Sequence, residues 1–299
     1  MQAPLIFEDS PASSPPLRAA VLGSGSGGNA VVVESGGIRV LIDAGFSCKE
    51  LERRMRLVGI EPSTITALLL THEHEDHVKG ADRFARKHRL PVYLTAGTMV
   101  GTVLGDEVTS RTVRIESGRP FEVGPFAVEA FSIPHDAREP VGFVLQDGGG
   151  RRLGLAADLG CRTQLAWGRL ADLDCLLIET NHDLEMLRSG PYPWPLKQRV
   201  ASRHGHLSNR EAADGLPELL AARLRFVVLY HLSRTNNLPA LAAAEVAETL
   251  AREGSAAEIV ISSQFEPTSW LEVGDAGGDN AEDAGRAVPG AERLVKNAG

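Results

Sequence analysis

The sequence predicts an α/β protein in which two β-sheets pack together and helices cover their outer faces. Short apolar runs of strand length recur in both halves of the chain, and helical segments follow them later in each half. Ionisable residues come directly after several of these runs. Strands grouped ahead of helices favour two packed layers of sheet, with the loops that follow the strands along one edge.

In the first half, the predicted strands are 18–22, 30–34, 38–43, 67–70 and 91–94. Ser35-Gly36-Gly37 is a hairpin-type turn between two of them. The spacing Ser47-x-x-Glu50 predicts a capping box and a helix to about residue 58, which Gly59 ends. A second helix is predicted over 78–88.

In the second half, the predicted strands are 112–115, 126–133, 141–145, 153–157, 175–178, 226–229 and 258–261. The predicted helices are 195–203, 209–222 and 239–252. Residues 1–16 and 275–299 are small, polar and rich in glycine and proline, which predicts disordered tails, the second of them acidic. We therefore expect one folded domain over 17–274.

The composition of the chain limits which binding partners and cellular locations are expected. The net charge of −8 argues mildly against a broad nucleic-acid surface, but 1–16 carry two acids and 271–299 carry six acids against three basic residues, which leaves −3 for 17–270. Three scattered cysteines, Cys48, Cys161 and Cys175, favour small buried residues over disulfides or a cysteine zinc site. Without a long apolar stretch or a secretory signal, we expect no membrane association and a cytoplasmic location.

A glycine-rich stretch, Gly23-Ser24-Gly25-Ser26-Gly27-Gly28, matches the G-x-G-x-x-G pattern of dinucleotide-binding proteins. That pattern requires a following helix whose N-terminus meets the pyrophosphate. A β-branched run, 30–33, follows here instead. The stretch therefore predicts a tight loop between two strands that passes close to a bound group.

The decisive stretch is His72-x-His74-x-Asp76-His77, directly after the predicted buried strand 67–70. In an extended turn, side chains two apart point the same way, so His72 and His74 can converge on one ion. After a bend, Asp76 and His77 can serve a second ion. Without metal, these groups would be crowded where desolvation is costly, so the pattern predicts a metal site.

Three later residues, His135, Asp158 and His231, each follow an apolar strand. Any one of them alone is more often a cap or a hydrogen-bonded surface group. Three in succession at strand ends favour metal ligation by all of them.

On these residues, the chain resembles the metallo-β-lactamase-fold hydrolases, and the match spans nearly all of 17–270. The resemblance implies a four-layer αβ/βα sandwich with two divalent ions, zinc or manganese. It also implies a ligand assignment: His72, His74 and His135 for the first ion, Asp76, His77 and His231 for the second, and Asp158 as the bridge.

Further stretches resemble the YycJ (WalJ) branch of that family, described as exonuclease-like and related to phosphoribosyl cyclic phosphodiesterases and tRNA 3′-processing endonucleases. They are residues 179–183, 190–193, 196–199, 205–209 and 231–237. The resemblance implies that His206 protonates the leaving oxygen and that Glu179 orients it, with Asp76 completing the catalytic set. A purely structural His206 is the alternative.

Several polar residues near these stretches are predicted to contact substrate. His182 is ambiguous between a substrate contact and another role, and His204 is expected to be an exposed helix-end residue. The candidates for phosphate or substrate contacts are His182, Lys197, Arg199, Ser208, Asn209, Ser233, Arg234, Asn236 and Asn237.

The leading hypothesis is a binuclear metal-dependent phosphodiesterase, most simply a DNA exonuclease, in which two ions share a water and present it as hydroxide. A small cyclic phosphodiester is the alternative substrate. A non-catalytic metal-binding module and an iron-dependent redox protein are weaker alternatives. The sequence leaves open whether the protein forms a homo-oligomer.

Overall fold

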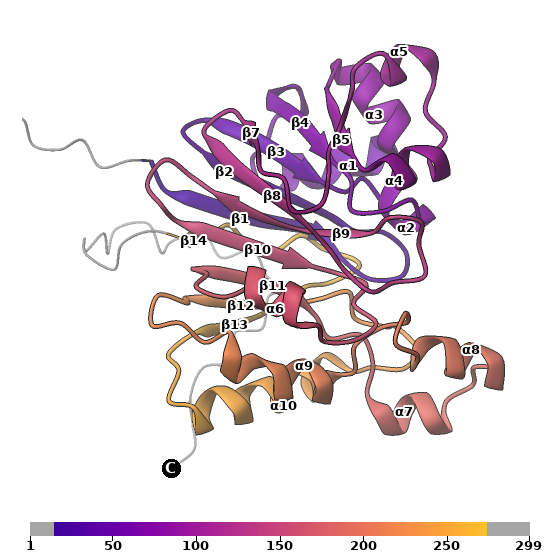
Figure 1. Cartoon of the computed structure of the whole chain (residues 1–299), viewed down its shortest axis with the longest axis vertical. Coiled ribbons are helices and arrows are strands. Elements are labelled where there is room, and N and C mark those ends of the chain that lie inside the picture. The colour runs from indigo at the N-terminus through magenta and orange to yellow at the C-terminus, as the bar shows by residue number, and fades with distance from the viewer. Residues whose placement is uncertain (1–14, 274–299) are drawn as a thin grey trace, which may run out of the picture.

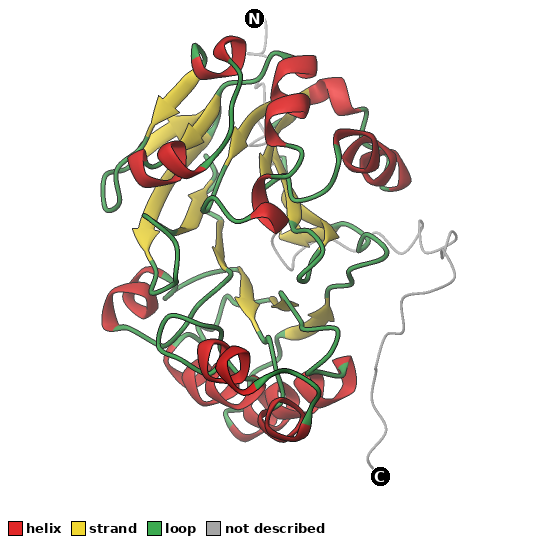
Figure 2. Cartoon of the chain, turned by 90° about the vertical axis from the view of Figure 1, so that its right-hand side faces the viewer, coloured by secondary structure: helices red, strands yellow, loops and turns green. Residues whose placement is uncertain are grey.

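The computed structural model describes residues 15–273, and within that range the chain forms two seven-stranded sheets packed face to face. Helices cover the outer face of each sheet (Figures 1 and 2). The first sheet has the order β14 (Leu271–Val273), β1 (Leu17–Gly23), β2 (Ala30–Ser35), β3 (Ile38–Ile42), β4 (Ile65–Leu69), β5 (Val92–Leu94), β6 (Thr112–Arg114). The second has the order β13 (Glu258–Ile261), β12 (Phe226–Tyr230), β11 (Cys175–Glu179), β10 (Arg152–Ala156), β9 (Val141–Gln146), β8 (Phe126–Ser132), β7 (Phe121–Val123).

Each sheet is antiparallel on one side and parallel on the other. Strands β3 to β6 and strands β10 to β13 are parallel, and parallel neighbours need crossover connections, which place helices on the outer faces. The helices of the first half are α1 (Cys48–Leu57), α2 (Glu75–Val78), α3 (Ala81–His88), α4 (Ala96–Gly101) and α5 (Asp106–Thr109). Those of the second half are α6 (Gln164–Arg169), α7 (Leu184–Ser189), α8 (Trp194–Val200), α9 (Asn209–Gly215) and α10 (Pro239–Arg252).

Strand β2 shows why so many strands read as continuous apolar runs. Val31 and Val33 pack into the core between the two sheets, whereas Val32 packs into the core between the first sheet and its helices. A strand buried on both faces cannot alternate apolar and polar residues. Three apolar layers therefore separate the four layers of secondary structure, and the four-layer α/β sandwich is confirmed.

Some elements differ from the sequence predictions. The helix predicted over 78–88 begins only at Ala81, as α3, and Val78 ends the separate helix α2. Between them, the Gly80 amide donates to the Ala44 carbonyl (2.8 Å), and a Cβ on Gly80 would lie 2.1 Å from the Phe46 carbonyl oxygen. The helix predicted over 209–222 ends at Gly215 and continues as a short 3₁₀ turn, and the helix predicted over 195–203 ends at Val200.

Short elements were not predicted, namely α4 to α7, β7 and β14. Their lengths of three to six residues carry little periodic signal. Apart from residues 15 and 16, the predicted tails 1–16 and 275–299 lie outside the described residues, as does residue 274. Within the described part of the chain, no helix is long and apolar enough to cross a bilayer.

The packing predicts a large difference between two leucine truncations. Leu177 of β11 is fully buried in the core between the sheets, whereas Leu165 of α6 is 53% exposed. We expect Leu177→Ala to lower the free energy of unfolding by about 2–5 kcal/mol, because it leaves a cavity among packed side chains. Leu165→Ala should cost less than about 1 kcal/mol. Urea unfolding of the two variants measures both, and equal losses would contradict the layered core.

Candidate metal centre

The histidine-rich loop bends because a helix begins inside it. After β4, the chain runs extended to His74, whose φ and ψ of −64° and 146° make it the N-cap of α2. Asp76 and His77 then lie in the first turn of that helix, while His72 lies in the extended part. His72 and His77 are fully buried at the base of the loop. The bend places the two pairs of side chains on neighbouring sites, as the sequence predicted.

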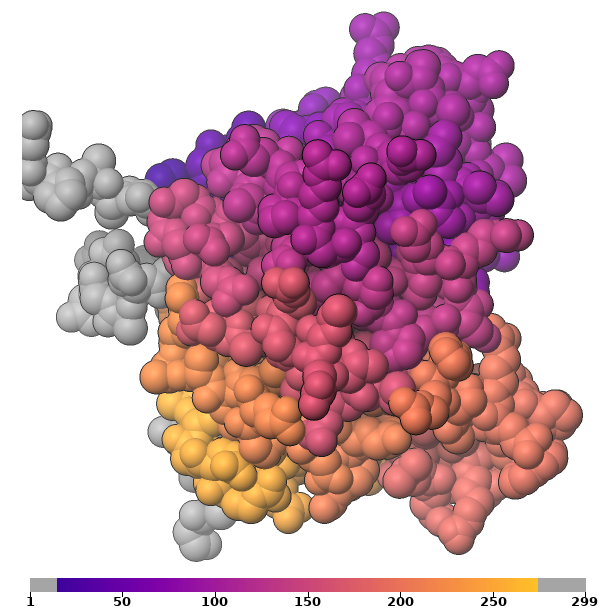
Figure 3. Space-filling model, viewed as in Figure 1, coloured from indigo at the N-terminus to yellow at the C-terminus, as the bar shows by residue number. Residues whose placement is uncertain are grey.

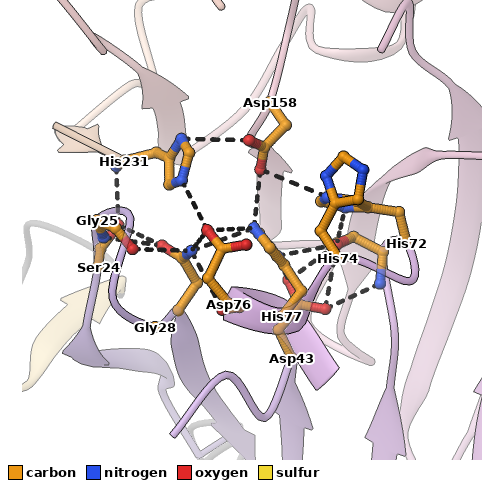
Figure 4. Close-up of polar contacts among 12 residues, drawn as sticks. Ser24, Gly25, Gly28, Asp43, His72, His74, Asp76, His77, Asp158 and His231 are labelled. Carbon is orange, nitrogen blue, oxygen red and sulfur yellow. Dashed lines mark hydrogen bonds and ion pairs between the residues drawn. The ribbon is translucent and has the colours of Figure 1, made fainter. Parts of the chain in front are cut away.

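The structure gathers the seven predicted ligands at one edge of the sandwich. Figure 4 labels all of them except His135. The nearest ligand atoms within each set lie within 4.8 Å of one another, and the sets are His72, His74 and His135, and Asp76, His77 and His231. His135 Nε2 lies 3.2 Å from His74 Nδ1, and His231 Nε2 lies 3.3 Å from Asp76 Oδ2.

Asp158 lies between the two sets. Its Oδ2 is 2.8 Å from His77 Nε2, without hydrogen-bond geometry, and 4.0 Å from His72 Nε2. Its Oδ1 is 3.3 Å from His231 Nδ1 and 3.8 Å from His135 Nε2. One carboxylate thus faces members of both sets, which is the geometry a bridging ligand requires.

Hydrogen bonds orient the imidazoles from behind. The Nδ1 of His77 lies 2.7 Å from Asp43 Oδ2, that of His72 lies 3.0 Å from Thr71 Oγ1, and that of His135 lies 3.1 Å from the Gly205 carbonyl oxygen. Each partner can accept a hydrogen from Nδ1, which leaves the Nε2 lone pair free. The rings are therefore held in the orientation and tautomer of metal ligands.

The backbone at three strand ends helps to aim these groups. Asp43, Asp158 and His231 follow β3, β10 and β12 closely and have φ values of 59°, 55° and 57°. Residues other than glycine seldom adopt this left-handed region, and such strain concentrates at functional sites. It turns each side chain out of the alternation of its strand and toward the shared edge.

The buried charges of the cluster compensate one another. Burial raises the pKa of the Asp158 carboxyl, but His231 and His77 beside it hold that pKa well below its usual value. Burial likewise opposes protonation of His231, yet Asp158, Asp76 and Glu179 raise its pKa to about 10. The centre thus pairs anionic carboxylates with imidazoles that attract protons.

His72, unlike His231, resists protonation. Burial, followed by the charges of His77 and other imidazoles, lowers the pKa of His72 well below its usual value. Its buried Nε2 has no hydrogen-bond partner among the described residues. An unpaired, neutral imidazole nitrogen beside two others costs free energy unless a metal ion occupies the gap. The residues present therefore fit a pair of divalent ions.

Sequence analysis missed three residues that support the centre, Asp43, Asn29 and Thr71. Asn29 is buried, its Oδ1 accepts from the Ser24 hydroxyl and the Gly25 amide, and its Nδ2 lies 3.3 Å from Asp76 Oδ2. Asp43 directly follows the apolar strand β3, the same signal that singled out Asp158, so it could have been found. Asn29 carries no comparable signal.

Glu179 and His206 meet as the resemblance implied. The fully buried Glu179 lies at the end of β11, and its Oε1 is 2.8 Å from both His206 Nδ1 and His231 Nδ1. Its Oε2 accepts from the Leu159 and Leu207 amides. Burial lowers the pKa of His206, but Glu179 outweighs this effect and raises that pKa. Glu179 therefore stabilises the protonated form of His206 relative to the neutral one.

A cavity of about 280 Å³ opens over these groups. Its lining consists of Ser26, His74, Glu75, Asp76, His135, Asp158, Arg199, His206 and His231. In Figure 3, the indigo to magenta surface of the N-terminal half lies above the orange surface of the C-terminal half. The residues that line the cavity come from both halves.

The predicted substrate contacts divide into two groups. Arg199 lines the cavity and pairs with Asp136 at 2.5 Å. The others do not line this cavity: they are His182, Lys197, Ser208, Asn209, Ser233, Arg234, Asn236 and Asn237.

Most of the second group hold the scaffold together. Ser208 caps α9 in a capping box with Glu211, and buried Asn237 donates to Asn209 and to the Thr180 and Asn181 carbonyls. Lys197 Nζ donates to the Arg188 carbonyl.

The two ambiguous histidines are also placed. His182 is 1% exposed, and neither ring nitrogen has a hydrogen-bond partner among the described residues. His204 is exposed just beyond α8, in agreement with the prediction.

The hydrogen bond behind His77 predicts how the centre responds to a single isosteric change. We expect Asp43→Asn to weaken metal binding by about 10- to 100-fold. An amide cannot accept hydrogen bonds from both the Thr71 hydroxyl and His77 Nδ1 as the carboxylate does. Metal content by mass spectrometry after dialysis against graded chelator measures the loss. Asp172→Asn, at an exposed carboxylate, is the matched control. Equal metal retention in both variants would contradict the orienting role.

Comparison with known proteins agrees with this geometry. Residues 38–232 match the model of the beta-lactamase superfamily domain. The chain is 34% identical to exodeoxyribonuclease YycJ of Bacillus anthracis over 240 residues, covering 80% of this chain and 90% of that one. It is 35% identical to exodeoxyribonuclease WalJ of Streptococcus pneumoniae over 242 residues, covering 79% and 89%.

Among solved structures, the metallo-beta-lactamase fold protein YhfI of Bacillus subtilis superposes with a TM-score of 0.66 at 17% identity, covering 86% of this chain and 99% of that one. The chain is therefore a metal-dependent hydrolase of the metallo-β-lactamase superfamily and belongs to the family of YycJ and WalJ.

Proposed function

We propose that this hydrolase cleaves phosphodiester bonds in DNA as an exonuclease, with two divalent ions and His206 as the proton donor. The observation that supports it most is the imidazole of His206, held at the mouth of the metal centre by the buried Glu179 carboxylate. A hydrolase of phosphodiesters needs both a place for cations and a proton for the departing alkoxide. The relatives at 34–35% identity are named exodeoxyribonucleases, which supports DNA as the substrate.

The two ligand sets would hold the ions in the assignment given above, with Asp158 between them. Bound zinc or manganese would polarise the phosphoryl oxygens and lower the pKa of an attacking water. Imidazole nitrogens form most of the ligand set and favour zinc, while the carboxylates of Asp76 and Asp158 keep manganese possible.

The protein's own groups would then position and protonate the substrate. Glu179 occupies His206 Nδ1, so Nε2 is the atom that can carry a proton toward the cavity. The side chain of His206 is 21% exposed, which leaves it accessible to a substrate, whereas Glu179 is fully enclosed. Arg199, at the rim, can shift from Asp136 to a phosphate oxygen.

A substrate panel separates DNA from a small cyclic phosphodiester. Metal-loaded protein should degrade single- or double-stranded DNA from an end and release mononucleotides, and chelator should abolish the activity until zinc or manganese is restored. Gel analysis of end-labelled oligonucleotides measures it. Hydrolysis of cyclic phosphodiesters and of bis(p-nitrophenyl) phosphate without any cleavage of DNA would overturn the nuclease proposal.

The leaving group tests the role of His206. We expect His206→Ala to lower kcat on DNA by about 10²- to 10⁴-fold, because an alkoxide must be protonated as it departs. On bis(p-nitrophenyl) phosphate, whose phenolate leaves without a proton, the loss should be less than about tenfold. His204→Ala, at the exposed neighbouring histidine, is the control and should match wild type on both substrates. Equal losses on DNA and on the aryl ester would refute the proton-donor role.

A further inference from the structure

A second cavity, of about 310 Å³, borders the metal centre. It is lined by Ser26, Gly27, Tyr192, Arg234 and Thr235. Ser26 lines both cavities, so the two are neighbours separated by the glycine-rich loop between β1 and β2. The sequence predicted that this loop passes close to a bound group. The metal centre lies on one side of the loop and does not explain the second cavity on its other side.

Arg234 gives this cavity its charge. It is the only ionisable cation or anion in the lining, and no ion pair of Arg234 occurs among the described residues. Arg199 at the neighbouring cavity, in contrast, is paired with Asp136. On a chain with a net charge of −8, an unpaired guanidinium next to a hydrolytic centre attracts an anion.

The position of Arg234 is fixed by an aromatic ring. Its guanidinium carbon lies 5.1 Å from the ring centroid of Phe265, which is itself 62% exposed. The preceding residue, Gln264, accepts from the Gly27 amide (2.6 Å) and donates to the Gly28 carbonyl (3.0 Å). One segment after β13 therefore anchors the glycine-rich loop and also supports Arg234, so the wall of the cavity is preorganised.

Tyr192 supplies the apolar part of the lining. It lies in the segment between α7 and α8 and is partly exposed. A tyrosine ring offers a face on which a nucleobase can stack, and stacking tolerates any base. The cavity thus combines a cation, hydroxyl groups of Ser26 and Thr235, and an aromatic ring, the set of groups that recognises a nucleotide.

We propose that this second cavity binds the nucleotide next to the scissile phosphodiester, with Arg234 on its phosphate and Tyr192 against its base. The inference rests on the proposed function, because only a polynucleotide places a second nucleotide beside the one being cleaved. A small ester reaches the metal centre alone and leaves this cavity unused. The cavity therefore sets a preference for strands over isolated phosphodiesters.

Binding of a single-stranded oligodeoxythymidylate with hydrolysis-resistant phosphorothioate linkages tests the proposal on metal-loaded protein by fluorescence anisotropy. We expect Arg234→Ala to weaken binding about tenfold and to reduce the magnitude of the slope of log K against log salt by about 0.7, the loss of one phosphate contact. Arg252→Ala, an equal charge change on the outer helix α10, should alter neither quantity. Tyr192→Ala should weaken binding about tenfold, while Tyr192→Phe retains it because the ring remains.

Hydrolysis of bis(p-nitrophenyl) phosphate by the same variants shows whether a negative result rules out the second site alone or the nuclease proposal as well. All four should keep kcat/KM within about twofold of wild type. Arg234→Ala that binds the oligonucleotide like wild type refutes the second site and leaves the nuclease proposal standing. Arg234→Ala that loses activity equally on the small ester also refutes it, because the residue then serves the centre itself. Wild type that binds no oligonucleotide refutes both proposals.

Discussion

The whole site depends on placing several ionisable groups in a space from which water is excluded. Asp158, His72, His77 and His231 are almost completely buried. Each would be costly to bury alone, and they are tolerated because carboxylates and imidazoles face one another at close range. A bound divalent cation would complete that balance, since it would supply a partner for His72 Nε2, which has none among the described residues.

The sandwich lowers the conformational free-energy cost of this arrangement. Rigid strands from both sheets end at one edge, and short turns after them carry the ligands, so little chain entropy remains to be lost when a substrate binds. The left-handed backbone at Asp43, Asp158 and His231 is held by the same strands. The apolar layers between the sheets and helices thus hold this strained backbone in place.

Many of the site residues and strands could be predicted from the sequence, because the residues that indicate them lie close together along the chain. Four of the predicted ligands lie within the six residues 72–77, and His135, Asp158 and His231 each follow an apolar run. The double burial of the strands also gave their positions to within a few residues. The segments that carried the least signal were the short helices α4 to α7 and the terminal strand β14, whose pairing with β1 is a long-range choice.

What the sequence could not supply was the direction of side chains. Ser208, Asn209 and Asn237 stand beside site residues in the chain, yet hydrogen bonds turn them into the scaffold. Asn29, far from the histidine loop in sequence, reaches Asp76 because the loops after β1 and β4 lie against each other, with the Asn29 amide donating to the Asp76 carbonyl. The sequence thus identified ionisable side chains that meet at one edge of the sandwich, but it did not predict where the neutral polar side chains point.

The shared oxygen of Glu179 has a consequence for how such an enzyme can diverge. Since Oε1 lies 2.8 Å from both His206 Nδ1 and His231 Nδ1, the two imidazoles depend on one carboxylate oxygen. A mutation that retunes one imidazole disturbs the other. New substrate preferences are therefore more accessible through the outer walls, where loops can change while this inner linkage stays intact.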